Sequence, residues 1–315
     1  MIWIVPGIIA VVVIEFLIRL PIILGVVKIF EQSPGFGVEP ARPRDDGEQF
    51  SLQSTHGLTI RGSIYAPSVA SRGVVIFCPE TGGNHWMALE YTVALLDAGF
   101  TVVSFDFRNQ GESDYMEGYD SFHWPTEFEV SDALATIDYV TGRDDLKSQP
   151  IAIFGVSRGG TIALTVAARR NEVRCVICDG AFIISKLMQF FARRWAELYV
   201  PRRWLQYIPD WHIASTLWFA RRISQYKRGV QYANLGRDLP KLRDKGALLI
   251  AGKIDKYVKP EMTDEIARRV GGNAQIWIAP RAKHNMARSK NQDEYDRRIV
   301  EFVEQHLVAL SSVKS

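Results

Sequence analysis

The chain has 315 residues, of which 47% are hydrophobic and 23% charged, and its formal net charge is +3. This composition is that of a folded protein with a sizeable core, and α/β folds reach this length as a single domain. So small a net charge does not indicate a nucleic-acid partner.

The three cysteines, Cys78, Cys175 and Cys178, all lie in strand-like runs. In a strand, Cys175 and Cys178 would point to opposite faces. We therefore interpret them as small buried hydrophobic residues, not as a disulfide or a metal site.

Residues 1–28 are too apolar for a soluble fold. Eighteen of residues 2–27 are Ile, Leu, Val or Phe, interrupted by two prolines and by Glu15 and Arg19. The two charges lie four residues apart on one helix face, where they can pair. We predict a single spanning or deeply embedded membrane anchor, with an interfacial helix as the open alternative. A cleaved signal peptide fits less well, because it would have a basic start and a shorter apolar core. Basic residues follow the segment and none precedes it, which favours a cytoplasmic location for the rest of the chain.

Residues 29–47 mix Pro, Gly and charges of both signs, and we interpret them as a linker. Strand patterns at residues 49–53 and 58–65 then predict a β-hairpin at a sheet edge. Further strands are expected at residues 73–78, 101–106, 151–154, 173–178, 247–251 and 275–279. Helices are expected at residues 86–98, 126–140, 260–270 and 293–310. This alternation predicts a parallel sheet with helices on both faces, and ligands bind such sheets at the carboxyl ends of the strands.

Between about residues 182 and 236 the alternation stops and the pattern becomes helical. Residues 186–230 contain nine Lys and Arg against two acidic residues, together with four tryptophans. We predict a cap inserted over the strand ends. Its basic and aromatic residues indicate either a solvated lid packed on the core or a surface that binds anionic membranes.

The segment 151–161 carries the strongest motif. An apolar strand pattern leads into Gly155-Val-Ser157-Arg158-Gly159, and a helical pattern follows. This is the order of a nucleophile elbow, in which a serine sits on a sharp turn and the two glycines leave room around it.

A serine nucleophile needs a base and an acid that orients the base. Asp255 follows the strand at 247–251, and His284 follows the strand at 275–279. The order Ser157, Asp255, His284 is that of α/β hydrolases. The five other histidines fit this role less well.

With these residues the chain resembles serine hydrolases of the α/β-hydrolase superfamily, in particular the branch with monoacylglycerol lipases and membrane-anchored acyl-protein hydrolases. The resemblance covers residues 48–310. The run from Asp106 through Arg108 and Gly111 to Ser113 is similar to that family's Asp-x-Arg-x-x-Gly-x-Ser motif, and we interpret it as structural.

The resemblance implies that the backbone amides of Thr81 and Arg158 form the oxyanion hole. Glu80 stands where the family has a glycine. A carboxylate that points inward would oppose the oxyanion. If Glu80 points away, for example toward a basic cap residue, the hole is preserved.

The expected function is a membrane-anchored serine hydrolase that cleaves esters or thioesters of lipid-like acyl substrates through an acyl-enzyme. No metal or organic cofactor is implied. A thioesterase, a peptidase or an acyltransferase could use the same residues. A non-catalytic binding protein on the same scaffold is the alternative from another class, and Glu80 is the feature that favours it.

Overall fold

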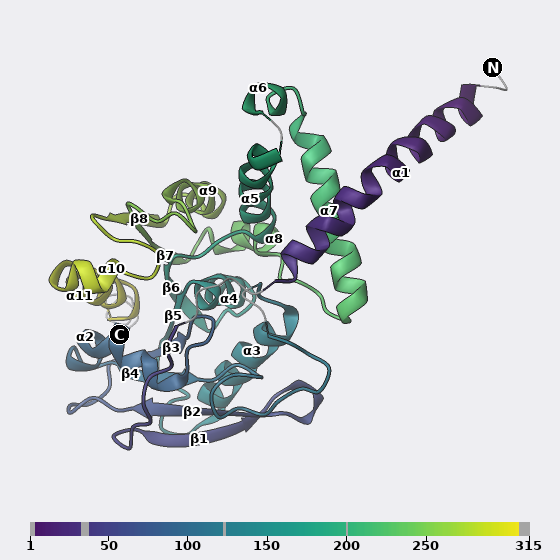
Figure 1. Ribbon diagram of the computed structural model, residues 1–315. Helices are drawn as coiled ribbons and strands as arrows, with labels where there is room; N and C mark the ends of the chain where they lie inside the picture. The colour runs from purple at the N-terminus through teal and green to yellow at the C-terminus, as the bar shows by residue number, and fades with distance from the viewer. Residues whose placement is uncertain (1–3, 33–37, 122–123, 200, 309–315) are drawn as a thin grey trace. The chain divides into compact units, whose positions relative to one another are not determined.

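The computed structural model describes residues 4–32, 38–121, 124–199 and 201–308, which form two compact units (Figure 1). The first unit holds α1 (Ile4–Phe30), α5 (Ile184–Tyr199), α6 (Arg202–Leu205) and α7 (Asp210–Arg228). The second unit holds the β-sheet and the other helices.

The sheet of the second unit has the strand order β1-β2-β4-β3-β5-β6-β7-β8. The strands are β1 (Glu48–Gln53), β2 (Thr59–Tyr65), β3 (Val74–Cys78), β4 (Thr101–Phe105), β5 (Ile151–Val156), β6 (Val173–Asp179), β7 (Gly246–Gly252) and β8 (Ala274–Ala279). The first two strands form the predicted antiparallel hairpin at the edge, and β2 is also antiparallel to β4. From β4 to β8 all neighbouring strands are parallel, as the alternation of elements predicted.

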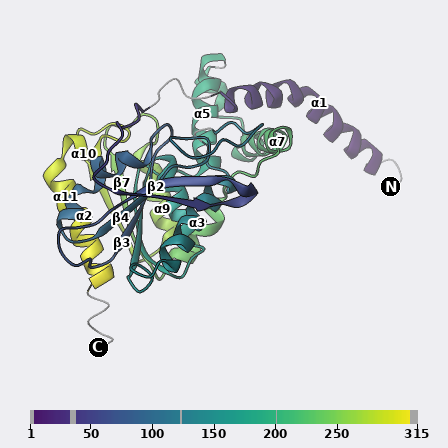
Figure 2. The same ribbon diagram turned by 90° about the horizontal axis from the view of Figure 1, so that it is seen from below.

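Helices cover both faces of the sheet because its central strands are apolar on both sides (Figure 2). One face packs against α3 (Glu127–Gly142), α4 (Arg158–Ala167) and α9 (Pro260–Val270), with α8 (Leu235–Asp238) and η3 (Leu239–Leu242) beside them. The other face packs against α2 (Leu89–Asp97) and α11 (Gln292–Val303). Cys175 belongs to the second cluster and Cys178 to the first, which confirms their predicted placement on opposite faces.

Two helices differ in form from the sequence expectation. The helix predicted from residue 86 begins as a short turn, η2 (His85–Ala88), and becomes α-helical only at Leu89. The backbone amide of His85 donates to the Asp106 carboxylate at 2.6 Å, and this bond fixes the tight turn. The last helix ends at Val303 and continues as a wider turn, η4 (Glu304–Val308), whereas residues 309–310 of the prediction lie outside the described residues. Two further short turns are η1 (Thr55–Gly57) and α10 (Ala287–Lys290).

In the first unit, α1 is the apolar helix that the sequence predicted, and it continues to Phe30. Among the described residues it is the helix that is long and apolar enough to cross a bilayer, with a mean hydropathy of 2.5 over an 18-residue window within residues 5–30. A membrane anchor and a signal sequence both have this character. The expected pair within α1 is present, since Arg19 Nη2 lies 2.9 Å from Glu15 Oε2.

Candidate active site

Ser157 lies on the sharp turn between β5 and α4. Its backbone has φ 51° and ψ −116°, a conformation that L-residues rarely adopt. Neighbouring backbone leaves no room for a side chain at Gly155 or Gly159. A Cβ at Gly155 would lie 2.2 Å from the Gly159 carbonyl oxygen, and one at Gly159 would lie 2.1 Å from that of Cys78. The two glycines therefore allow the turn that presents Ser157.

The second unit contains a row of two hydrogen bonds that runs from Ser157 through His284 to Asp255. The Ser157 Oγ lies 2.9 Å from His284 Nε2, and His284 Nδ1 lies 2.7 Å from Asp255 Oδ2. The three residues follow β5, β8 and β7, whose carboxyl ends meet at one edge of the parallel sheet. The structure thus brings together three side chains that are 29 to 127 residues apart in sequence.

The bonds of Asp255 define the tautomer of His284. The backbone amides of Tyr257 and Val258 donate to Asp255 Oδ1 at 2.7 and 2.9 Å, which holds the carboxylate in place. A carboxylate only accepts, so the proton lies on His284 Nδ1. The Nε2 atom is then free to accept the Ser157 hydroxyl proton, which is the protonation state that a general base requires.

Glu80 is buried beside this row, with 3% of its surface exposed. Its carboxylate accepts the Tyr91 hydroxyl at 2.8 Å and the side-chain amide of Asn285. Both partners are neutral and belong to the second unit, so the suggested basic cap partner is wrong. Burial raises the pKa of Glu80, against the hydrogen bond from Tyr91 and the charge of His284.

Asp179, at the end of β6, is a buried carboxyl that the sequence analysis did not single out. Its backbone carbonyl accepts the amide of Ser157 at 2.7 Å, and its side chain accepts the Tyr295 hydroxyl at 3.2 Å. Burial raises the pKa of Asp179 to about 7, while the nearby charge of His284 lowers it. The sequence signal that could have identified Asp179 is its position at the carboxyl end of β6, the strand between β5 and β7.

A pocket of about 700 Å³ opens beside His284. Apolar and aromatic side chains form much of its wall, among them Met87, Tyr91, Tyr257 and Met286. Charged and polar side chains, among them Glu90, Lys256 and Lys283, also line it. A mostly apolar wall that carries such polar groups suits a small organic ligand.

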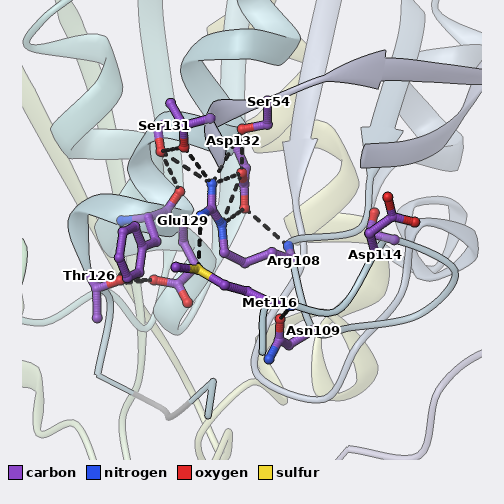
Figure 3. Close-up of polar contacts among 12 residues, drawn as sticks. Ser54, Arg108, Asn109, Asp114, Met116, Thr126, Glu129, Ser131 and Asp132 are labelled. Carbon is purple, nitrogen blue, oxygen red and sulfur yellow. Dashed lines mark hydrogen bonds and ion pairs between the residues drawn. The ribbon is translucent and has the colours of Figure 1, made fainter. Parts of the chain in front are cut away.

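The loop after β4 is held in place by buried charges (Figure 3). Arg108 and Asp132 of α3 are fully buried and paired, with Arg108 Nη2 2.6 Å from Asp132 Oδ1. Asp106 holds His85 through Nδ1 at 2.8 Å. Of the five histidines other than His284, His85 is therefore a buried structural residue. Another of them, His123, lies outside the described residues.

Of the two residues expected to donate to an oxyanion, one directly follows Ser157 in the chain and the other lies in the loop after β3, the strand that pairs with β5. Arg158 is the first residue of α4, and Thr81 is half-buried after β3. The Arg158 side chain turns away to Ser121 Oγ, at 2.7 Å, and to Glu129, at 3.5 Å.

Comparisons with known proteins agree with this architecture. A family described as alpha/beta hydrolase fold matches residues 73–208. The uncharacterized protein YqkD of Bacillus subtilis is 25% identical over 256 residues, which cover 81% of this chain and 78% of YqkD. The WAV2 protein of Arabidopsis thaliana, an alpha/beta hydrolase domain-containing protein, is 26% identical over 53% of this chain and 51% of its own length.

Solved structures show the same fold. The esterase Pf2001 of Pyrococcus furiosus superposes with a TM-score of 0.62 at 21% identity, covering 87% of this chain and all of the esterase. Est1E of Butyrivibrio proteoclasticus, solved with ferulic acid bound, has a TM-score of 0.60 at 16% identity and covers 82% of this chain and 98% of Est1E. The chain therefore has the α/β-hydrolase fold.

Proposed function

We propose that the protein is a membrane-anchored serine hydrolase that cleaves ester or thioester bonds of lipid-like acyl substrates. The observation that carries this proposal is the row from Ser157 through His284 to Asp255. A strained serine on an elbow, a histidine with a free acceptor nitrogen and a buried orienting carboxylate are the parts that acyl transfer needs.

In the proposed mechanism the Ser157 oxygen attacks the acyl carbonyl carbon while His284 Nε2 takes the hydroxyl proton. Asp255 stabilises the imidazolium that forms and keeps the ring oriented. The tetrahedral intermediate collapses to an acyl-enzyme as His284 returns the proton to the leaving alcohol or thiol. A water activated by the same histidine then releases the acid.

The backbone amides of Thr81 and Arg158 are our proposed oxyanion donors. Arg158 begins α4, where amides point out of the helix and the dipole favours negative charge. Glu80 is compatible with this hole because Tyr91 and Asn285 bind its two oxygens.

Two features support a lipid-like substrate at a membrane. The wall of the pocket beside His284 is largely apolar, as an acyl chain requires. The exposed apolar surface of α1 would be covered by lipid. We also propose, from the basic residues after α1, that the second unit lies in the cytoplasm.

Labelling with a fluorophosphonate probe tests the proposal. The parent protein should be labelled, and the Ser157→Ala variant should not be. A panel of p-nitrophenyl esters of increasing chain length then reports the acyl preference. A folded parent protein that neither reacts with the probe nor cleaves any ester would instead be a binding protein on this scaffold.

A further inference from the structure

The second half of α1 lies beside α7, and their contacts keep a nearly constant register. Near the start, His212 Nε2 lies 3.1 Å from Glu15 Oε1, and the partners are 197 residues apart. At the end, Lys227 Nζ donates to Glu31 Oε2 at 2.7 Å, with a separation of 196. A constant separation means that the two helices run in the same direction, with contacts in step from Glu15 to Glu31, although they cross at an angle (Figure 1).

Between the Glu15–His212 contact and the Glu31–Lys227 contact, the two helices meet first through polar side chains and then through apolar ones. Arg19 Nη1 donates to Ser215 Oγ at 2.7 Å, and the arginine is only 8% exposed. Farther along, Ile23 and Val27 pack against Ala220. We call this set of contacts, from Glu15 to Glu31, the α1–α7 ladder. Because of it, Arg19 faces protein and not lipid, whereas the Glu15 side chain is bonded to α7 and stays 42% exposed.

Before the ladder, α1 projects away from the other described helices of the first unit (Figure 1). Every residue from 5 to 14 is exposed, and none of them is charged. Ten helical residues extend about 15 Å. That is roughly half of the hydrocarbon thickness of a bilayer.

Charged groups gather at the level where the ladder begins. Asp210, the first residue of α7, forms an ion pair with Arg193 of α5, and both side chains are exposed. Glu15 and His212 lie at the same level. Exposed ions are strongly disfavoured in hydrocarbon, so this level fits the headgroup region.

We propose that α1 is a one-leaflet anchor, in which residues 5–14 enter the hydrocarbon of one leaflet, the start of the α1–α7 ladder lies at headgroup level and the rest of the ladder lies outside the bilayer. Trp211 and Trp218 of α7 are 68% and 46% exposed, and tryptophan favours that region. The anchor then does not cross the membrane. This inference rests on the membrane attachment in the proposed function and does not depend on the hydrolase chemistry.

Depth-dependent quenching on the full chain in phosphatidylcholine–phosphatidylglycerol vesicles tests the inference. Single cysteines at Ile8, Leu17 and Ile29, which are 59%, 59% and 40% exposed, carry an environment-sensitive fluorophore. Lipids brominated near the headgroup or near the chain end supply the quencher. The native cysteines are buried, so the parent protein gives the labelling background.

A one-leaflet anchor should give its strongest deep quenching at Ile8, with Leu17 quenched mainly by the shallow bromines. Ile29, about 18 Å farther along α1, should be quenched least. A spanning helix would give the opposite order, because Leu17 is the midpoint of α1 and would lie deepest. That order would overturn the one-leaflet anchor and leave membrane attachment intact. Absence of quenching at all three positions would overturn membrane attachment as well. Cleavage of a soluble ester by the same samples reports separately on the hydrolase proposal.

A pair of double variants tests whether the ladder sets the depth. Glu15→Leu with Arg19→Leu removes its first polar contacts without a change in net charge, and should shift Leu17 from shallow to deep quenching. Glu39→Leu with Arg42→Leu, two exposed residues after α1, is the matched control and should leave the profile unchanged. A Leu17 signal that stays shallow in the first variant would show that the ladder does not hold α1 at this depth.

Discussion

The side-chain amide of Asn285 donates a hydrogen bond to the Glu80 carboxylate and so joins the loop after β8 to the loop after β3. Asn285 directly follows His284, and Glu80 directly precedes Thr81. The bond therefore links the proposed general base to a proposed oxyanion donor. Asn285 has φ 55°, a left-handed conformation that asparagine tolerates better than most residues. Glu80, which stands where the family that the sequence resembles has a glycine, thus has a structural role.

Removal of the Glu80 carboxylate should impair catalysis. The Glu80→Ala variant leaves the buried Tyr91 hydroxyl and the Asn285 amide without this acceptor, at a cost of about 1–3 kcal/mol. We expect kcat/KM for a short p-nitrophenyl ester to fall about tenfold or more, and less in Glu80→Gln, which can still accept from Tyr91. Glu90→Ala is the control, because Glu90 is an exposed carboxylate at the same pocket. Parent-like activity in Glu80→Ala would refute the linking role.

Substitutions in the Ser157–His284–Asp255 row should abolish turnover without unfolding the protein. We expect His284→Ala to lower kcat by several orders of magnitude. Asp255→Asn should cost nearly as much, because an amide can donate to Nδ1 and favour the wrong tautomer. Ester hydrolysis measures the effect, and an unchanged circular dichroism spectrum shows that the fold is intact. If Asp255→Asn turned over at the parent rate, Asp255 would not be the orienting acid.

Asp179 should make folding stability depend on pH. Its pKa rises from an ordinary 3.8 to about 7 on burial, so between these values the folded protein keeps a proton that the unfolded chain has lost. The free energy of unfolding therefore falls as pH rises through this window, by at most about 4 kcal/mol for this group. The Asp179→Asn variant should gain stability relative to the parent from pH 5 to pH 8, as measured by urea denaturation.

Asp264→Asn, which changes an exposed aspartate on α9, is the control for this pH series. Its difference in stability from the parent should be the same at pH 5 and pH 8. The prediction for Asp179 is wrong if its variant behaves in the same way as this control.

The buried pair Arg108–Asp132 should matter far more for stability than exposed pairs do. Asp132→Ala leaves a fully buried guanidinium without its carboxylate, and we expect a loss of about 3–5 kcal/mol in the free energy of unfolding. Glu304→Ala breaks the exposed pair with Arg72 and should cost no more than about 1 kcal/mol. Equal losses in the two variants would show that burial does not set the strength of the Arg108–Asp132 pair.

Much of the fold was predictable because its signals are local in sequence. A strand that is buried on both faces is an apolar run, and β3 to β7 are such runs. Gly155 and Gly159 mark the elbow because backbone within a few residues, or on the neighbouring strand, fills the space where their side chains would be. Ser157, Asp255 and His284 could be predicted together because parallel strands place all their carboxyl ends at one edge.

The remaining features depend on contacts between distant parts of the chain, which no local pattern specifies. One of the two partners of Glu80, Asn285, is 205 residues away, and only the docking of two loops brings it there. In the same way, Glu15 and Arg19 form a helix-face pair in the sequence, whereas their contacts with α7 arise only when two segments nearly 200 residues apart pack together. The sequence by itself determined the elements and the order of the reactive residues, because these follow from local periodicity. The tertiary structure alone decided the surroundings of each charge, because burial and hydrogen bonding depend on which surfaces meet.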